Sequence, residues 1–347
     1  MKTPAAILVE QRQPLVLDEV EVPALGYGQV LVEVAVTRIC GSQIGEIDGV
    51  KGPDRFLPHL LGHEGGGTIL EVGPEVRKVK AGDRVVLHWR PGTGIDSRPP
   101  VYTWNGRNCN AGCVATFSRF AVVSENRLTP VAAMVDFEIC ALLADTLTTG
   151  FGVITNNARI RIGESVVVIG VGGIGLGVIL GAKLAGAYPI IAVDLYDHKL
   201  AKAREYGATH TINSTRDDFD AASMAILHGP ADAVIDGSAQ PAVLEKAFAL
   251  AGPQGRCVVF GVMPHDRKLS LNTLPLHFGK TLTGSHGGES EPAHDIPRYL
   301  RLMDGGGFDP RGMVSHRVKL ADINDTIARM RSGEVIHAMI HFPASSS

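Results

Sequence analysis

The sequence predicts an α/β protein in which a doubly wound parallel sheet is combined with a β-rich domain. Two patterns support this fold class. Short alternating segments rich in β-branched residues occupy the first third of the chain, as in antiparallel sheets. Later, continuous apolar strands alternate with helical segments, as in parallel sheets covered on both faces. The chain has 347 residues, 45% of them apolar, which is enough for two domains.

The N-terminal part is expected to form a compact barrel or sandwich. Proline and glycine supply turns between the predicted strands, which cover residues 6–9, 15–17, 30–36, 67–73 and 82–87. Residues 90–112 are rich in Pro, Gly, Arg and Asn and show little periodicity, so we expect a long surface loop there.

The second half of the chain is expected to alternate strands with helices. Apolar residues at helical spacing begin at Phe137, and Gly150 and Gly152 interrupt or end that helix. The predicted strands that follow cover residues 165–169, 189–193, 233–236 and 256–260, with helices between them. The last part is predicted to contain helices at 297–303 and 323–331 and a closing strand at 338–342 that rejoins the N-terminal β region.

The composition excludes several classes of function. A formal net charge of −3 leaves no large basic surface, so neither nucleic acid nor an anionic membrane is an expected partner. Apolar runs such as 165–169 are far shorter than the roughly 20 residues of a membrane span. The N-terminus lacks the pattern of a secretory signal, so we expect a cytoplasmic protein. Five cysteines spread over the chain do not form the pattern of a disulfide framework.

A glycine-rich segment predicts a dinucleotide site. The motif G-x-G-x-x-G directly follows a predicted strand and opens a helix, and its residues include Gly170, Gly172, Gly173, Ile174 and Gly175. The first glycine permits the tight turn, the second lets the backbone approach a pyrophosphate, and the last lets helix and strand pack closely. Backbone N–H groups at the helix N-terminus then bind the anion. The alternative is that the glycines serve packing alone.

An acidic residue supports the dinucleotide site. Asp194 lies 19 residues after Gly175 at the end of the next apolar strand, where a carboxylate can accept hydrogen bonds from both ribose hydroxyls. The same carboxylate would repel a 2′-phosphate, so NAD is favoured over NADP. Lys199 is expected to contact the ribose or adenine side of the cofactor, the alternative being a solvated lysine on a helix.

Two short motifs in the β-rich region suggest a metal site. Cys40-Gly-Ser42 follows a predicted strand, and Gly62-His63-Glu64-Gly65 lies between two others. A thiol and an imidazole on separate turns could share a zinc ion, which accepts sulfur and nitrogen ligands. Two ligands do not specify a site by themselves, because a lone histidine is more often a hydrogen-bonded structural residue.

The order and spacing of six segments resemble the zinc-dependent medium-chain alcohol dehydrogenase family over nearly the whole chain. The segments are Cys40-Gly-Ser42, Gly62-His63-Glu64, Gly82-Asp83-Arg-Val, Thr148-Thr149-Gly150, the 170–175 loop with Asp194, and residues 195–208. The resemblance implies a β-rich, GroES-like catalytic domain at 1–147, a Rossmann domain at 148–288, and a segment at 289–347 that completes the catalytic domain. It also implies that zinc and nicotinamide meet in a cleft between the domains.

The resemblance assigns Cys40 and His63 as ligands of a catalytic zinc ion (Zn²⁺). The third ligand of the family is commonly a cysteine, and the corresponding position here is Asp145. A carboxylate oxygen can bind zinc, although an acid at the end of a helix can also cap the helix or form an ion pair. Glu64 resembles the carboxylate beside the metal, which in such enzymes can enter the coordination shell transiently.

The resemblance also assigns residues around the substrate and the nicotinamide. Ser42 matches the hydroxyl that passes the substrate proton toward solvent, although it could simply form the turn. Thr149 and Ile174 match positions against the nicotinamide ring and are also plausible packing residues. Trp89 corresponds to an aromatic wall of the substrate pocket, which it would narrow.

The implied reaction is a reversible transfer of hydride from a zinc-bound alcohol to NAD, which gives an aldehyde or ketone. The family's structural zinc needs four cysteines, and this sequence offers only Cys109 and Cys113, so one catalytic zinc per chain is expected. The alternatives are a zinc-free NADPH-dependent reductase of enones or quinones, and a dinucleotide-binding protein without turnover. The expected partners are a small alcohol or carbonyl substrate and further copies of the chain in a homodimer or homotetramer.

Overall fold

The computed structural model describes residues 1–343, and these residues form two compact units. Unit 1 combines Met1–Asp145 with the described residues from Glu291 onward, and unit 2 is Thr146–Ser290. The two ends of the chain therefore belong to one unit and the middle segment forms the other. The finer domain boundaries implied by the resemblance, at 147/148 and 288/289, stay predictions.

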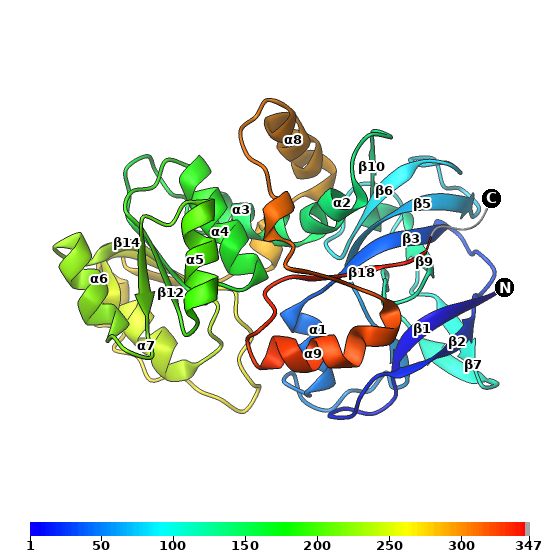
Figure 1. The fold of residues 1–347 in the computed structure, drawn as a ribbon, viewed down its shortest axis with the longest axis horizontal. Helices are drawn as coiled ribbons and strands as arrows, with labels where there is room; N and C mark the ends of the chain where they lie inside the picture. Colours follow the sequence, from blue (N-terminus) through cyan, green and yellow to red (C-terminus); the bar gives the residue numbers. More distant parts are fainter. Residues whose placement is uncertain (344–347) are drawn as a thin grey trace. The chain divides into compact units, whose positions relative to one another are not determined.

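Unit 1 contains two β assemblies. In its described residues, a closed barrel has the strand order β1 (Lys2–Leu8), β2 (Val16–Glu21), β7 (Val101–Trp104), β8 (Arg107–Asn110) and β4 (His59–Leu60). A seven-stranded sheet has the order β10 (Leu128–Val131), β6 (Arg84–His88), β5 (Glu64–Val72), β3 (Gln29–Ile39), β18 (Ala338–His341) and β17 (His316–Val318), with β9 (Phe120–Ser124) paired to β3. β18 lies antiparallel beside β3, which confirms that the closing strand rejoins the N-terminal β region (Figure 1).

Part of the loop expected at 90–112 is a β-hairpin. β7 and β8 pair antiparallel across a tight turn at Asn105 and Gly106, whose φ angles are 50° and 73°. The expectation of a loop was therefore wrong for residues 101–110. An Asn-Gly pair between two extended segments is a hairpin signal, because both turn positions favour residues that tolerate positive φ. Trp104 Nε1 donates a hydrogen bond to Asp18 Oδ2 at 2.8 Å and fastens the hairpin to β2.

A buried carboxylate holds the segment between β6 and β7. Glu125 is 2% exposed and begins the short 3₁₀ helix η1 (Glu125–Arg127). Its oxygens accept hydrogen bonds from the backbone N–H groups of Arg77, Lys78 and Ile95, each at 2.7 Å. Burial by itself raises the pKa of Glu125, but these N–H groups lower it below its ordinary value. The charged carboxylate therefore fastens three parts of the chain at one point.

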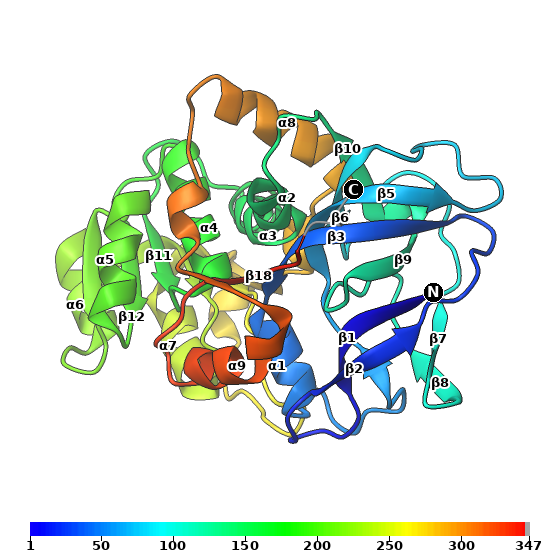
Figure 2. The ribbon, with the colours of Figure 1, turned by 45° about the vertical axis from the view of Figure 1, so that its right-hand side comes forward.

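The helices of unit 1 pack against these sheets. In the described residues they are α1 (Gly41–Ile47), α2 (Phe137–Ala144), α8 (Pro292–Asp304) and α9 (Ile323–Arg331), with the short 3₁₀ helices η1, η5 (Arg311–Met313) and η6 (Leu320–Asp322). Figure 2 shows α1 and α9 side by side, as does Figure 1, and Ile47 shares an apolar cluster with Ile323 and Ile327. The predicted helices at 297–303 and 323–331 are confirmed, although α8 begins at Pro292.

Unit 2 has the predicted doubly wound architecture. Its parallel sheet has the order β13 (His210–Asn213), β12 (Ile190–Asp194), β11 (Val166–Ile169), β14 (Ala231–Asp236), β15 (Ala251–Val259) and β16 (Thr281–Gly284). The helical segments are α3 (Thr146–Gly152), the π-helical η2 (Val153–Asn157), α4 (Gly173–Leu184), α5 (Asp197–Tyr206), α6 (Phe219–Leu227), α7 (Pro241–Leu250), η3 (Leu274–Phe278) and η4 (Gly287–Glu289). The strand order reverses between β11 and β14, and sheets of this kind bind ligands at the C-terminal strand ends beside such a reversal.

One apolar helical run is long enough to be compared with a membrane span. Among residues 1–343, the run Phe137–Asn157 passes a test of length and composition for a spanning helix. Of its most apolar window, 94% is buried inside the structure, as expected for a core helix. The run is therefore weak evidence for a membrane segment.

Candidate metal centre

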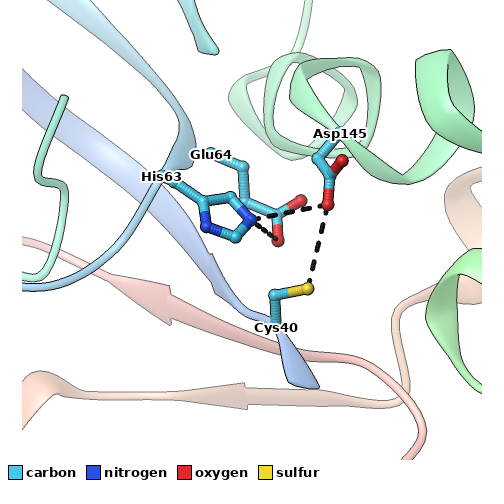
Figure 3. A group of neighbouring side chains, drawn as sticks. All are labelled: Cys40, His63, Glu64 and Asp145. Carbon is cyan, nitrogen blue, oxygen red and sulfur yellow. Dashed lines mark hydrogen bonds and ion pairs between the residues drawn. The ribbon is translucent and has the colours of Figure 1, made fainter. Parts of the chain in front are cut away.

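Four side chains with metal-binding atoms meet in unit 1 and form what we call the metal group: Cys40, His63, Glu64 and Asp145 (Figure 3). Cys40 directly follows β3 and is the N-cap of α1, and Asp145 directly follows α2. Glu64 is the first residue of β5, and His63 directly precedes it. The ligand atoms of the four residues all lie within 4.8 Å of one another. Within residues 1–343 this is the one group of three or more His, Cys, Asp or Glu side chains arranged in this way.

The local backbone explains how two of these side chains reach the group. Gly62 precedes His63 with a φ of +91°, and a Cβ at this position would lie 2.4 Å from Thr116 Oγ1. Only glycine therefore fits the turn that delivers His63. Asp145 has a φ of −147° and a ψ of −54°, which ends α2, and its carboxylate points toward Cys40 and His63 (Figure 3).

One oxygen of Asp145 contacts both other predicted ligands. Asp145 Oδ2 lies 3.8 Å from Cys40 Sγ and 3.4 Å from His63 Nε2. His63 Nε2 in turn lies 3.8 Å from Glu64 Oε1. Thiolate sulfur, imidazole nitrogen and carboxylate oxygen are the donors that zinc binds in tetrahedral sites. The donor set therefore fits a zinc ion.

The electrostatics of the group also fit a cation. Burial by itself lowers the pKa of His63, but the side chains of Asp145 and Cys40 raise this pKa well above its ordinary value, so the group attracts positive charge. Ser42 Oγ and Glu64 Oε2 are buried, and neither forms a hydrogen bond with a described residue. Buried polar atoms are rarely left without a partner, so these two atoms indicate that an ion, a water molecule or a substrate binds beside them.

Arg38 is a buried cation that the sequence reasoning did not identify. It lies on β3, is 2% exposed, and donates from Nη1 to Glu64 Oε1 at 2.6 Å. Burial raises the pKa of Glu64 to about 7, against the opposing effect of Arg38. The signal in the sequence was a positively charged residue in a largely apolar strand, two positions before Cys40.

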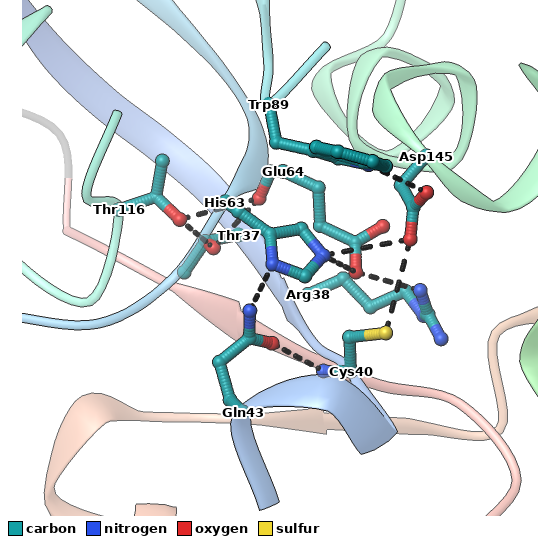
Figure 4. A network of polar contacts seen from close by, with 9 residues as sticks. All are labelled: Thr37, Arg38, Cys40, Gln43, His63, Glu64, Trp89, Thr116 and Asp145. Carbon is teal, nitrogen blue, oxygen red and sulfur yellow. Dashed lines mark hydrogen bonds and ion pairs between the residues drawn. The ribbon is translucent and has the colours of Figure 1, made fainter. Parts of the chain in front are cut away.

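Gln43 connects two of the predicted ligands (Figure 4). The backbone N–H of Cys40 donates to Gln43 Oε1 at 3.0 Å, and Gln43 Nε2 contacts His63 Nδ1. Gln43 is 2% exposed. Its amide therefore joins the turn that carries Cys40 to the imidazole of His63, on the side of the ring opposite the metal group.

Trp89, which follows β6, contacts two side chains of the group. Its Nε1 donates a hydrogen bond to Asp145 Oδ1 at 3.0 Å, and its ring centroid lies 6.3 Å from that of His63. The indole ring covers the group on one side (Figure 4). Whether Trp89 also forms a wall of a substrate pocket stays a prediction.

Ser42 lies in the first turn of α1, two residues after Cys40.

A cavity of about 670 Å³ lies beside the metal group within unit 1. His63 and Gln43 form part of its wall, and the exposed Phe56 lies at its edge. The charged and polar side chains of the wall also include Gln11, Glu46, Lys51, Asp54, Arg55, His59 and Asn110. Its volume falls in the range of roughly 300–1,000 Å³ typical of small-molecule sites.

The glycine-rich loop of unit 2 follows β11 and leads into α4. Gly170 has a φ of +88°, in the left-handed region that favours glycine. A Cβ at Gly175 would lie 2.1 Å from the carbonyl oxygen of Gly170, so a side chain there would force the loop away from the helix. A Cβ at Gly172 would meet no atom within 4 Å, which leaves open space beside the backbone. Gly173 is the first residue of α4.

Asp194 is the other predicted cofactor residue that lies at this loop. It ends β12, and its Oδ2 accepts a hydrogen bond from the backbone N–H of Val171 at 2.7 Å. Lys199 lies on α5, with Nζ 4.9 Å from the ring centroid of Tyr196. Ile174 is in the first turn of α4 and is partly buried, and Thr149 is buried on α3. The structure thus joins Asp194 to the glycine loop and places Lys199 and Thr149 on separate helices.

Comparisons with known proteins match both units. A family model described as "Alcohol dehydrogenase GroES-like domain" matches residues 26–133, and one described as "Zinc-binding dehydrogenase" matches residues 173–305. An alcohol dehydrogenase class-3 from Cereibacter sphaeroides is 30% identical, with 99% of this chain and 100% of that protein covered. An NDMA-dependent alcohol dehydrogenase from Amycolatopsis methanolica is 32% identical, with coverages of 98% and 99%. The crystal structure of a benzyl alcohol dehydrogenase from Acinetobacter calcoaceticus superimposes with a TM-score of 0.89 at 27% identity, over 99% of this chain and 100% of that chain.

Proposed function

Since this chain belongs to the zinc-dependent medium-chain alcohol dehydrogenase family, we propose that it oxidises a small alcohol to an aldehyde or ketone with NAD, reversibly, at one catalytic zinc site. Membership of the family implies zinc and NAD as cofactors. The observation that carries the proposal is the meeting of Cys40, His63 and Asp145 from three separate elements, with ligand atoms within 4.8 Å of one another. The same donor set disfavours a zinc-free reductase and a dinucleotide-binding protein without turnover.

In this proposal Cys40, His63 and Asp145 hold the zinc ion, and Glu64 stays beside it. The thiolate of Cys40 and the carboxylate of Asp145 together balance the charge of the metal. Arg38 balances Glu64 through the contact of 2.6 Å, so Glu64 does not need the metal as its counter-charge. The proposal takes one zinc per chain, because no second group of three or more His, Cys, Asp or Glu ligand atoms within 4.8 Å of one another occurs in residues 1–343.

The chemistry divides between the cofactors and the chain. Bound zinc supplies a Lewis acid that lowers the pKa of an alcohol, and bound NAD supplies the hydride acceptor. Ser42 would relay the proton of the substrate hydroxyl: its Oγ accepts that proton and gives its own hydroxyl proton to water leading to solvent. This role is supported by the buried Ser42 Oγ, which has no hydrogen-bond partner among the described residues. The indole of Trp89 limits the space beside the metal and excludes water from it.

Unit 2 binds NAD in this proposal. The loop 170–175 leads into the N-terminus of α4, where backbone N–H groups favour a pyrophosphate, and the open space at Gly172 lets it approach. Asp194 accepts from the ribose and disfavours a 2′-phosphate, and Lys199 lies on the following helix. Thr149 and Ile174 contact the nicotinamide.

The assembly and location of the protein are also proposed. We infer a homodimer or homotetramer, supported by β16 at the sheet edge and by three exposed apolar side chains in the preceding segment, Leu274, Leu276 and Phe278. We infer a cytoplasmic location, which suits a centre that needs a reduced thiol. All five cysteines, which lie in the described residues, are free.

The proposal is tested with Asp145→Ala and, as the matched control, Asp145→Cys, which restores a zinc-binding atom. The wild-type protein should contain about one zinc per chain by mass spectrometry and form NADH with short alcohols. The alanine variant should lose zinc and alcohol oxidation, whereas the cysteine variant should keep zinc. Both variants should bind NADH with the affinity of the wild type, as measured by NADH fluorescence. Unchanged zinc content in the alanine variant would reject Asp145 as a ligand, and a folded wild-type protein without zinc would reject the proposed function.

A further inference from the structure

The two carboxylate oxygens of Asp145 have different partners. Oδ1 accepts the hydrogen bond from Trp89 Nε1 at 3.0 Å. Oδ2 faces Cys40 Sγ at 3.8 Å and His63 Nε2 at 3.4 Å. The carboxylate therefore presents one oxygen to the potential ligands and has the other occupied by an N–H donor (Figure 4).

We propose that Trp89 is a positioning residue whose indole N–H holds Oδ1 of Asp145, so that the carboxylate offers Oδ2 alone to the zinc ion. The inference rests on the proposed function, because it takes Asp145 as a ligand. It gives Trp89 a role in metal binding that is separate from any role as a wall against the substrate.

The donor itself is held from outside the metal group. Trp89 directly follows β6, and Arg127 donates from its guanidinium to the backbone carbonyl of Trp89. The preceding residue, His88, is fully buried and is fixed at both ring nitrogens, at 2.7 Å from the Arg90 carbonyl and 2.9 Å from Thr129 Oγ1. These contacts hold the backbone that carries the indole, and none of them involves a proposed ligand of the metal. The position of Trp89 therefore does not depend on Asp145 alone, so its N–H can orient the carboxylate.

A carboxylate needs such a partner more than a thiolate does. A carboxylate can bind a metal through one oxygen or both, and rotation about its terminal bond exchanges them, whereas a thiolate has one donor atom. A hydrogen bond to the second oxygen removes this choice and orients the first one. Partners of this kind typically change metal affinity by about 10–100-fold. Trp89 and Asp145 are therefore expected to act as a pair.

The test is a double-mutant cycle on zinc affinity. Trp89→Phe keeps an aromatic ring and removes the N–H, and it is made in the wild type and in Asp145→Cys. Zinc dissociation constants are measured by competition with a chromogenic chelator, without any substrate. With Asp145 present, Trp89→Phe should weaken zinc binding by about 10–100-fold. With cysteine at position 145, the same change should alter affinity by less than about threefold, since a thiolate has no second oxygen to hold.

A second readout separates positioning from a packing effect. In the cobalt-substituted protein, the visible bands of the metal should shift on Trp89→Phe when Asp145 is present and stay unchanged in the cysteine background. A residue that only walled the substrate site would change KM for bulky alcohols and leave the zinc affinity and the cobalt spectrum unchanged. That result would overturn the inference.

Other outcomes are equally decisive. Equal losses of zinc affinity in both backgrounds would mean that the ring packs against the site without orienting Asp145, which overturns the inference. If Asp145→Ala loses zinc and Trp89→Phe binds zinc as tightly as the wild type, the inference is overturned and the proposed ligand set stays intact. Full zinc retention in Asp145→Ala would overturn both, so the two failures are distinguishable.

Discussion

Replacing Gln43 by glutamate should tighten zinc binding. The amide of Gln43 stands between two N–H groups that the metal-loaded site contains at the same time. One is the backbone N–H of Cys40, at 3.0 Å from Gln43 Oε1. The other is on His63, because an imidazole that binds zinc through Nε2 carries its proton on Nδ1, the atom that Gln43 contacts.

An amide cannot serve both groups. With Oε1 toward Cys40, the NH₂ group faces the N–H of His63; with the amide turned over, it faces the N–H of Cys40. Either orientation leaves one buried N–H opposite another donor, and Gln43 is only 2% exposed, so water does not readily compensate. An unsatisfied buried donor costs about 1–3 kcal/mol. A glutamate of the same length has two acceptors and satisfies both donors.

The expected gain is roughly tenfold in zinc affinity, since about 1.4 kcal/mol corresponds to a factor of 10. Zinc affinity is measured by chelator competition for the wild type, Gln43→Glu and Gln43→Met. Methionine has a similar length, no donor and only a weakly accepting sulfur. The predicted order of affinity is glutamate, then glutamine, then methionine. A glutamate variant that binds zinc no better than the wild type would refute the reasoning, because it would show that the two N–H groups do not compete for one acceptor.

Two further predictions concern stability. Glu125→Gln replaces one carboxylate oxygen by an NH₂ group that faces backbone N–H donors. It should lower the free energy of unfolding, measured in urea, by about 2–3 kcal/mol and leave the zinc content unchanged. A loss below about 0.5 kcal/mol would contradict this prediction. Burial lowers the pKa of His88 to about 3. Below about pH 6.5 the unfolded chain therefore binds a proton at His88 that the folded chain does not bind, so the free energy of unfolding decreases as the pH is lowered. His88→Asn should therefore lose about 2 kcal/mol less than the wild type between pH 7 and pH 5, and identical pH profiles would be evidence against a buried neutral histidine.

The sequence predicted the features that depend on neighbouring residues. The loop from Gly170 to Gly175 could be identified because strand, turn and helix follow one another and each glycine has a local reason. The hairpin at Asn105 and Gly106 also had a local signal, which the irregular composition around it obscured. The strand β13 was not predicted, because four residues with a mixed pattern give little periodicity.

Contacts between distant residues could not be predicted in the same way. The pairing of Arg38 with Glu64 spans 26 residues and that of Trp89 with Asp145 spans 56. Each depends on how strands and helices pack, which no single segment encodes. The resemblance suggested which residues would form the metal group, but it could not assign a hydrogen bond to a carboxylate at a position that the family commonly fills with cysteine.

The fastening of the segment after β6 by Glu125 separates the folding of this region from the supply of metal. Three backbone N–H groups and a carboxylate are always present in the chain, whereas a thiolate-bound ion must be acquired and can be removed by chelators or oxidants. Loss of zinc from the proposed centre at Cys40 is then expected to stop alcohol oxidation without exposing this segment to proteases. Adding zinc back to such a protein is then expected to restore activity without refolding of this segment.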